Sequence, residues 1–352
     1  MSSIDSDILV LVVGAGPSGA TAAYYSGRSG ISVLLIDKKA RVGSPVRCGE
    51  FIPRPLLRGL ELDEAIIMQR IETMLIHTPD KKTHRFYAPG YMIDRGSFDQ
   101  ALVEKAKKIG IQVWLNTEFK KIDRGAVYID QEGQEISIKP KLIIGGDGPN
   151  SRVGGSINYR NPELILGVQR SYPLAQQQDA IEIFIDPQFY GGYGWLFPKR
   201  DSANVGISIK GMGLRKAKEL LSRFTSDLIA NGKIGEKVIA ETSGLIPVNG
   251  PGIFHKDNIL LCGDALGAVH PITGSGIPFA IETGRIAGRY AAAAITGNDP
   301  AILSRYETTW QKGFQNEFER AKRRRRFMEE NWADLSRIYK RIWPSFREYY
   351  DD

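Results

Sequence analysis

Apolar residues near the start of the chain gather in short runs, and small or polar residues separate these runs. Residues 8–13 (ILVLVV) predict a buried strand, and residues 32–37 (SVLLID) predict a second strand that ends in an acidic residue. Residues 14–27, rich in glycine and alanine, predict a tight turn followed by a helix of small residues. The order strand, turn, helix, strand predicts a β-α-β unit of a parallel α/β fold.

Three glycines in this unit have the spacing of a dinucleotide-binding turn. Gly14 permits the tight turn, Gly16 lets the backbone approach a pyrophosphate, and Gly19 lets the helix pack closely on the strand. The helix N-terminus then faces the phosphates, where its unpaired N–H groups stabilise anions. Asp37 closes the second strand, where its carboxylate can accept hydrogen bonds from ribose hydroxyls. Strand, spacing and acid together predict dinucleotide binding.

Two later segments repeat the pattern of an apolar strand that ends in glycine and aspartate. One is residues 141–148 (KLIIGGDG), and the other is residues 258–264 (NILLCGD), which leads into a long helix rich in small residues. The three sites resemble the flavin-binding fingerprints of glutathione-reductase-like FAD proteins, specifically the p-hydroxybenzoate-hydroxylase branch. The resemblance implies an α/β fold with a Rossmann-like FAD-binding domain, and FAD as the cofactor.

The same resemblance implies roles for individual residues. Asp264 would bind ribityl or pyrophosphate oxygens, and the helix beginning near residues 274–276 would point its N-terminus at the flavin ring, favouring anionic reduced flavin. Arg95 precedes a helix expected to return to the FAD domain, with Ser97 as a candidate cap. The expected cofactor-binding residues are Gly14, Gly16, Gly19, Asp37, Lys38, Arg47, Cys48, Gly49, Arg95, Asp147, Gly148, Gly263, Asp264, Gly274, Ser275, Gly276 and Ile277.

The middle of the chain, roughly residues 160–245, changes to short segments in which apolar and polar residues alternate. This pattern predicts an antiparallel sheet over the flavin, and such a sheet usually holds the substrate. Alternation places Tyr193, Trp195 and Phe197 on one face of the sheet. That face is either core packing or the wall of an apolar substrate site, and the residues alone leave both interpretations open.

Two short motifs together look like those of the geranylgeranyl reductase family, whose archaeal members saturate isoprenoid chains of membrane lipids. They are RCGE at residues 47–50 and YGWLFP at residues 193–198. The resemblance implies FAD-dependent reduction of prenyl carbon–carbon double bonds, with a prenyl lipid as substrate. It implies Cys48, Tyr193 and Trp195 as catalytic residues. The implied substrate contacts are Tyr193, Trp195, Phe197, Pro198 and His270.

Cys48 is the residue whose role is least obvious. By its family position it would lie close to the flavin ring, where Arg47 could lower the pKa of the thiol and Glu50 could help fix the turn. We hypothesise that Cys48 tunes the flavin environment or helps deliver the alkene proton, the alternative being a small buried hydrophobic residue. Cys262 ends an apolar strand and is expected in the core.

The reductant is expected to come from outside the chain. A nicotinamide-dependent enzyme of the disulfide-reductase type would carry a second glycine fingerprint in mid-chain and a CxxxxC pair, and the sequence shows neither. The electron donor is therefore expected to be ferredoxin, NAD(P)H or reduced deazaflavin.

Other functions remain open at this point. An FAD-dependent monooxygenase or halogenase of an apolar substrate shares this architecture, and so does a non-catalytic prenyl-binding protein like the GDP-dissociation inhibitors. No nucleic-acid partner is expected, because no recognised motif is present. His270, without further ligands, gives no case for a metal.

Charge and composition bear on location and on the C-terminal region. The 352 residues carry a net charge of +7, which suggests an acidic partner. The chain has only 2 cysteines, a number that fits a reducing cytosol. The start, MSSIDSD, shows no secretory signal, and no apolar run approaches the ~18 residues of a membrane span. We expect a cytoplasmic protein, with peripheral contact at the inner membrane face as an open alternative.

Residues 300–350 are expected to form helices. They carry the basic run 322–326, which is either a solvated helix face or a docking patch for an acidic partner. Aromatic residues recur among the basic ones, as expected for an amphipathic surface that lies against the core or against anionic lipid. These aromatic residues are Trp310, Phe314, Phe318, Trp332, Tyr339 and Trp343.

The patterns also divide the chain. The FAD-binding domain is expected in residues 1–75, 94–160 and 243–300. The antiparallel substrate domain is expected in residues 76–93 and 161–242, and a C-terminal helical segment in residues 301–352.

Overall fold

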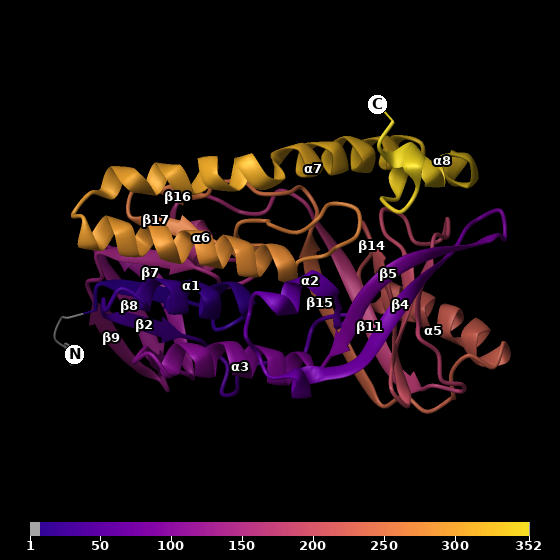
Figure 1. Ribbon diagram of the computed structural model, residues 1–352, viewed down its shortest axis with the longest axis horizontal. Coiled ribbons are helices and arrows are strands. Elements are labelled where there is room, and N and C mark those ends of the chain that lie inside the picture. Colours follow the sequence, from indigo (N-terminus) through magenta and orange to yellow (C-terminus); the bar gives the residue numbers. More distant parts are fainter. Residues whose placement is uncertain (1–7, 352) are drawn as a thin grey trace.

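The computed structural model describes residues 8–351, so the start MSSIDSD and residue 352 lie outside the described residues. Two bodies of β-structure lie side by side along the longest axis of the molecule (Figure 1). The long helix α7 (Arg305–Glu330) runs across both of them and leads to the C-terminus.

Within residues 8–351, a six-stranded sheet forms the centre of the first body. Its core strands β10, β1 and β2 pair in parallel and are buried along their whole length, which confirms the predicted β-α-β unit. Strands covered on both faces read as continuous apolar runs, as here. In spatial order the strands are β16 (His255–Lys256), β17 (Ile259–Leu261), β10 (Leu142–Gly145), β1 (Val10–Val13), β2 (Val33–Ile36) and β6 (Gln112–Trp114).

Helices α1 (Pro17–Gly27), α3 (Arg95–Lys107) and α6 (Ile277–Thr296) belong to the first body. Helices α1 and α6 touch backbone to backbone: a Cβ at Gly284 would lie 2.3 Å from the Ser18 carbonyl oxygen. The small residues predicted for both helices therefore serve this close approach.

A small antiparallel sheet of β7 (Thr117–Asp123), β8 (Ala126–Gln131) and β9 (Gln134–Ile138) extends this body, followed by the short helix α4 (Arg152–Ser156).

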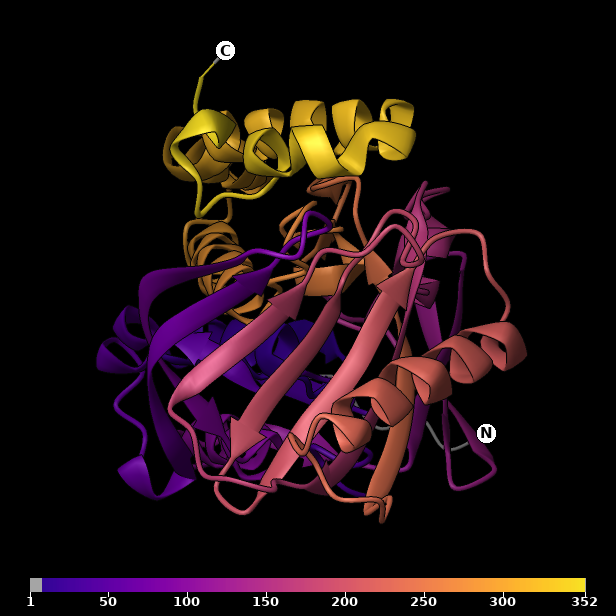
Figure 2. The ribbon, with the colours of Figure 1, turned by 90° about the vertical axis from the view of Figure 1, so that its right-hand side faces the viewer.

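The described part of the chain also forms an eight-stranded sheet, which makes the second body (Figure 2). It is antiparallel except that β12 pairs with β4 in parallel, a pairing the sequence did not predict. In spatial order the strands are β15 (Ala240–Pro247), β11 (Leu164–Pro173), β14 (Ser202–Ile209), β13 (Gly194–Lys199), β12 (Ala180–Phe184), β4 (Ile67–His77), β5 (Thr83–Ile93) and β3 (Phe51–Pro53).

The sheet moves two of the expected domain boundaries. The expected boundary between residues 75 and 76 cuts through β4, and the boundary at 243 cuts through β15, which pairs with β11 as far as Pro247. Strand β3, expected in the FAD-binding domain, also belongs to this sheet. Hydrogen-bonded register decides these boundaries, and it cannot be read from alternation alone.

The two faces of the eight-stranded sheet have different covers. Helix α5 (Leu214–Ala230), which the strand pattern did not predict, packs Leu221 and Leu228 on one face. On the other face, Trp195 and Phe197 share a core cluster with C-terminal residues such as Trp343. Short connecting elements are α2 (Arg54–Arg58), η1 (Glu64–Ile66) and η2 (Gly263–Ala265).

The C-terminal region is helical, as predicted. After η3 (Pro300–Ser304) and α7 come η4 (Trp332–Asp334), α8 (Leu335–Ile342) and η5 (Arg347–Tyr349). The expected aromatic residues of α7 pack against the core: Trp310 and Phe318 are buried beside Phe279 of α6.

The basic run 322–326 is not simply a solvated face. Arg324 and Arg325 are buried, while Arg323 and Arg326 are exposed. Among residues 8–351, no helix combines the length and apolar character that a membrane crossing requires.

Candidate active site

The loop between β1 and α1 has the shape that a pyrophosphate site requires. Gly14 has φ +98°, and a Cβ there would meet the Gly146 carbonyl oxygen at 2.4 Å. Gly16 stands at the N-cap of α1 without a side-chain cap, and nothing lies within 4 Å of a Cβ built on it. The N-terminal N–H groups of α1 therefore border open space, where an anion gains both hydrogen bonds and the helix dipole.

Asp37 supports this loop directly. Its Oδ2 accepts a hydrogen bond from the Ala15 N–H at 2.7 Å, and its Oδ1 accepts one from the Lys39 N–H at 2.8 Å. A carboxylate offers further lone pairs beyond these two. Contact with a ribose stays a prediction for Asp37.

Asp147, in the second fingerprint, is occupied by its own neighbours. Its carboxylate accepts hydrogen bonds from the Ser151 hydroxyl at 2.6 Å and from the N–H groups of Arg152 and Val153. Burial raises the pKa of Asp147 despite these donors. Gly148, with φ +87°, has open space around its Cβ position.

Arg95 lies at the centre of a charged cluster that the sequence did not show. Its Nε donates to Asp99 at 2.8 Å, and its guanidinium also hydrogen-bonds to the Cys48 thiol. Although burial opposes the charge, Asp99 and Cys48 together raise the pKa of Arg95. The helix cap here is Asp94, which accepts from the Ser97 N–H at 2.7 Å, so the expected capping role of Ser97 was wrong.

The prediction for Cys48 and Arg47 needs correction. Burial raises the pKa of the Cys48 thiol above 9.0, and the cation that opposes this shift is Arg95. Arg47 is exposed and is not among the groups that shift the pKa of the thiol. The thiol is therefore protonated at neutral pH, because burial destabilises the thiolate more than the nearby Arg95 stabilises it.

Asp264, in the third fingerprint, has a half-buried carboxylate. Burial raises its pKa from the ordinary value of 3.8 to about 6, against the pull of Arg95. A carboxylate offers several acceptor sites, so this group can accept hydrogen bonds from ligand hydroxyls. Its Oδ1 lies 3.5 Å from the Cβ position of Gly276, the N-cap of α6.

The loop of residues 270–276 leads into α6 and meets the eight-stranded sheet. Tyr193 donates its hydroxyl to the Thr273 carbonyl oxygen at 2.5 Å. His270 accepts from the N–H groups of Ile272 and Thr273, and its other ring nitrogen bonds Glu317 of α7 at 3.0 Å. Both ring nitrogens are thus used within the chain. Substrate contact stays a prediction for His270.

The three expected aromatic residues form a continuous wall. Ring centroids are 5.9 Å apart for Tyr193 and Trp195, and 6.3 Å apart for Trp195 and Phe197. Glycine makes room for them: a Cβ at Gly206 would lie 2.3 Å from the Trp195 ring, and one at Gly49 would lie 2.9 Å from the Phe197 ring.

Pro198 does not join this wall. Strand alternation turns it to the opposite face, together with Leu196, which packs in the cluster beneath α5. Substrate contact of Pro198 therefore stays a prediction that its place opposite the wall does not support.

Hydrogen bonds tie the wall to the RCGE turn. The Trp195 indole N–H donates to Gln169 Oε1 at 3.0 Å, and Gln169 Nε2 donates to the Cys48 carbonyl oxygen at 3.1 Å. Burial raises the pKa of Tyr193, and the ionised form of the nearby Cys48 thiol adds to this shift. Cys48, Arg95, Tyr193 and Trp195 are therefore neighbours.

Glu50 fixes the turn, as the sequence suggested, by contacts the sequence did not reveal. It has φ +70°, and its buried carboxylate accepts from Lys199 at 2.8 and 2.9 Å and from Asn204 at 2.7 Å. It also accepts from the Arg95 N–H at 3.0 Å. One carboxylate thus joins the turn, the substrate sheet and the start of α3.

Gln169, Lys199, Asn204 and Asp99 were missed in the sequence reading. Two of them carried a usable signal, because Gln169 and Asn204 are polar residues inside otherwise apolar strands. A buried polar residue needs a partner, so such breaks in a pattern point to a network.

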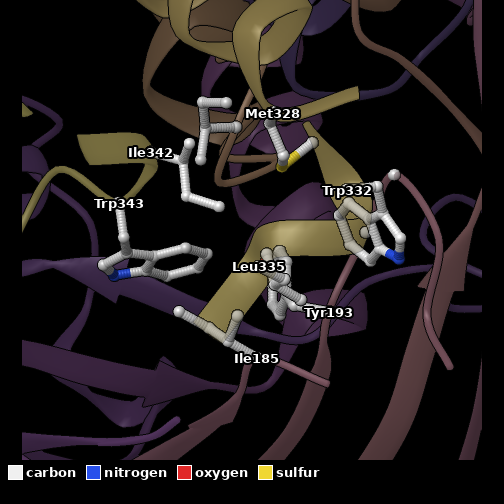
Figure 3. A pocket seen from close by; sticks show the side chains of 10 residues that line it. Ile185, Tyr193, Met328, Trp332, Leu335, Ile342 and Trp343 are labelled. Carbon is white, nitrogen blue, oxygen red and sulfur yellow. The ribbon is translucent and has the colours of Figure 1, made fainter. Parts of the chain in front are cut away.

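Two cavities border the site. A polar one of about 230 Å³ lies beside the start of α3 and is lined by Arg41, Val42, Gly43, Ser44, Asp94, Gly96, Ser97 and Gln100. An apolar one of about 10 Å³ lies against Tyr193 and the C-terminal segment (Figure 3). Among residues 8–351, no group of three or more His, Cys, Asp or Glu residues is arranged to hold a metal ion.

Comparison with known proteins gives a consistent result. The FAD binding domain model matches residues 7–168, and the geranylgeranyl reductase catalytic domain model matches residues 167–246. Digeranylgeranylglycerophospholipid reductase 1 of Methanopyrus kandleri is 33% identical over 336 residues, covering 89% of this chain and 88% of the relative.

Solved structures show the same architecture. A geranylgeranyl bacteriochlorophyll reductase-like protein from Thermoplasma acidophilum superposes with a TM-score of 0.83 and 27% identity, covering 93% of this chain and 91% of the other. A flavin-dependent halogenase superposes with a TM-score of 0.75 at 17% identity, covering 93% of this chain and 67% of the other, and shows the fold alone.

Proposed function

This chain belongs to the geranylgeranyl reductase family, and from that premise we propose that it is an FAD-dependent reductase of carbon–carbon double bonds in prenyl chains of lipids. The observation that best supports this assignment is a juxtaposition. A protonated thiol, a buried cation and an aromatic wall meet beside the loop that leads into α6.

The residues present fit FAD. The open N-terminus of α1 suits the pyrophosphate, and the half-buried Asp264 carboxylate suits ribityl hydroxyls. The N-terminus of α6, at Gly276, is expected to face the ring. When bound and reduced, FAD supplies the hydride equivalent that an unpolarised alkene needs.

The chain itself must supply a proton, because saturation adds a hydride to one alkene carbon and a proton to the other. We assign this role to Cys48 Sγ–H, which burial keeps protonated. When the proton leaves, the adjacent Arg95 guanidinium stabilises the thiolate, and solvent returns the proton after turnover. Asp99 keeps Arg95 oriented toward the thiol.

The aromatic wall suits an apolar, flexible substrate. Trp195 and Phe197 are each 8% exposed, so their faces meet other apolar groups and not water. Prenyl carbons gain on the order of 0.8 kcal/mol for each CH₂-sized group transferred from water to such a surface. Trp195 cannot swing away freely, since its indole N–H is held by Gln169.

Two finer points belong to the same proposal. Electrons come from an external carrier, which the sequence suggests is ferredoxin, NAD(P)H or reduced deazaflavin. The lipid substrate is met at an anionic membrane surface, and the exposed Arg326, Arg337 and Arg341 of the C-terminal region supply positive charge for such contact.

One anaerobic experiment tests the assignment. Protein loaded with FAD is reduced with dithionite and mixed with a digeranylgeranyl glycerophospholipid in detergent, and the flavin absorbance is followed. We expect reoxidation by the lipid, with a mass gain of about two per reduced bond. Absence of reoxidation by lipid here, together with oxygenation of an apolar compound in a parallel run with oxygen, would instead identify a monooxygenase.

A further inference from the structure

The C-terminal segment covers the Tyr193 end of the aromatic wall. The Trp343 ring stands edge-on to the Tyr193 ring at a centroid distance of 5.0 Å. Leu335 and Ile342 of α8 line the apolar cavity together with Tyr193 (Figure 3). The remaining volume, about 10 Å³, is close to the ~10–15 Å³ that a single water molecule needs. No isoprene unit fits beside Tyr193 while this segment is seated.

We infer that residues 332–349, here called the cap, occupy the prenyl channel and leave it when the protein binds an anionic lipid bilayer. The inference rests on the proposed function, because the channel is defined by the substrate wall. It specifies the partner, a negatively charged membrane, and the event that opens the site.

The cap has the composition of an interfacial helix. Along α8, Leu335, Ile338 and Ile342 are buried against the sheet, while Arg337 and Arg341 are exposed. An amphipathic helix with basic residues on its polar face lies in the interface of anionic membranes, with its apolar face among acyl chains. The apolar face that leaves the channel would thus enter lipid, so the exchange exposes little apolar surface to water.

The attachments of the cap differ from those of α7. The cap meets the sheet through neutral groups, including Tyr339 with His84 at 3.3 Å and the Trp332 indole N–H with the Pro187 carbonyl oxygen at 2.9 Å. At its far end, the Tyr349 carbonyl oxygen accepts a hydrogen bond from Arg324 of α7 at 2.9 Å. Helix α7 instead carries the buried Arg325, which donates to the Pro271 carbonyl oxygen at 3.1 Å and pairs with Glu329 at 2.8 Å.

Further contacts hold α7 in place and mark where the cap begins. Glu163, just before β11, pairs with Arg325 and with Lys210, just after β14. Glu317 of α7 holds His270 of the flavin-facing loop. The α-helical ladder ends at Asn331, between α7 and η4. Movement is therefore expected on the C-terminal side of Asn331, with α7 remaining on the core.

Membrane binding is tested with a triple substitution on the outer face of α8, Arg337→Gln, Lys340→Gln and Arg341→Gln. The matched control removes the same charge from exposed positions of α5, on the other face of the sheet (Figure 2): Arg215→Gln, Lys216→Gln and Arg223→Gln. Each basic residue near an anionic surface contributes about a fivefold factor, so the α8 variant should bind phosphatidylglycerol vesicles about 100-fold more weakly. The α5 variant should sediment with vesicles as the unmodified protein does.

Displacement of the cap is tested with a pair of cysteines at Met74→Cys and Ser345→Cys. The Ser345 hydroxyl and the Met74 sulfur are 3.7 Å apart, so a short bifunctional thiol reagent can join the two positions when the cap is seated. We expect anionic vesicles to slow this cross-linking and neutral phosphatidylcholine vesicles to leave it unchanged. Ser345→Cys alone, treated with the same reagent, controls for reaction at native cysteines.

Cross-linked protein gives the functional outcome. It should keep its FAD and its reduction by dithionite, yet lose reoxidation by prenyl lipid by at least tenfold, while the single-cysteine control retains it. Equal cross-linking with and without anionic vesicles, or full activity of the joined protein, overturns the cap inference. Failure of the unmodified protein to reduce prenyl lipid in any medium counts against the proposed function instead, and the vesicle cross-linking result still decides whether the cap moves.

Discussion

Replacing Asp264 by asparagine should stabilise the protein without cofactor and weaken its hold on FAD. The carboxylate has its pKa raised from 3.8 to about 6 by burial, with Arg95 opposing, so its charged form is disfavoured in the folded state. At 1.36 kcal/mol per pH unit, this difference corresponds to about 3 kcal/mol. The residue keeps partial contact with solvent, which makes about 3 kcal/mol an upper limit.

The sign of the effect depends on pH. Below the unfolded pKa of 3.8, Asp264 is protonated in both states and costs nothing. As the pH rises from about 4 to about 6, the unfolded state loses its proton first, so the cofactor-free protein loses stability in this window. Asp264→Asn lacks this loss. The variant should therefore equal the parent near pH 4 and exceed it at pH 7.

Urea denaturation of the FAD-free proteins at several pH values measures this difference, and titration with FAD measures the binding cost. Loss of a charged acceptor should weaken FAD binding by about 1.5–3 kcal/mol, roughly ten- to a hundredfold. Asp99→Asn is the matched control with the opposite sign, because it leaves the buried Arg95 guanidinium without its partner and should destabilise the protein by about 3–5 kcal/mol. A parent and Asp264→Asn variant that lose stability in parallel across pH 4–7 would refute the reasoning.

Three further predictions concern the turn and the wall. Cys48→Ser should slow single-turnover prenyl reduction by about 10²–10⁴-fold with FAD still bound, and the parent rate should show no thiol-linked fall below pH 9 because burial raises the pKa of Cys48 above 9.0. Equal stopped-flow rates for Cys48→Ser and the parent protein would exclude a role for the thiol. Gly206→Ala places a methyl group 2.3 Å from the Trp195 indole ring and should lower the free energy of unfolding by about 1–3 kcal/mol. Gly167→Ala places one 3.2 Å from the flexible end of Ile246 and should lower it much less. Equal shifts of the melting temperature for the two variants would contradict this packing. Glu50→Gln should destabilise the protein by about 3–5 kcal/mol, because it removes the buried carboxylate that pairs with the half-buried Lys199. Glu61→Gln, in an exposed pair, should leave the urea midpoint unchanged. Similar midpoints for both variants would count against the network.

The site shows how one short turn serves several purposes. The RCGE segment places a thiol beside Arg95. Its Glu50 carboxylate accepts hydrogen bonds from Lys199 and Asn204 of the sheet. Each partner comes from a different element, so an error in docking the two bodies would break all of these contacts together. The contacts of the turn therefore depend on correct docking of the two bodies, and so does the position of the thiol proposed for the reaction.

Local patterns in the sequence were enough for the nucleotide-binding half of the molecule. The strand at residues 10–13, its glycine turn and the following helix are specified by neighbours a few positions apart, and the same holds for the turns near Asp147 and Asp264. Alternation likewise placed Tyr193, Trp195 and Phe197 on one face. Periodicity and glycine conformation act over short range, so the chain displays them directly.

What only the tertiary structure decided depends on residues distant in sequence. The parallel pairing of β12 with β4, the Arg95 cation beside Cys48, the occupied nitrogens of His270 and the cap over Tyr193 each join segments far apart in the chain. A residue's type and spacing state which contacts it can make. Which contact it does make is fixed by how buried surfaces and hydrogen-bond partners are shared across the whole fold, because each buried polar group takes the partner that packing brings within reach.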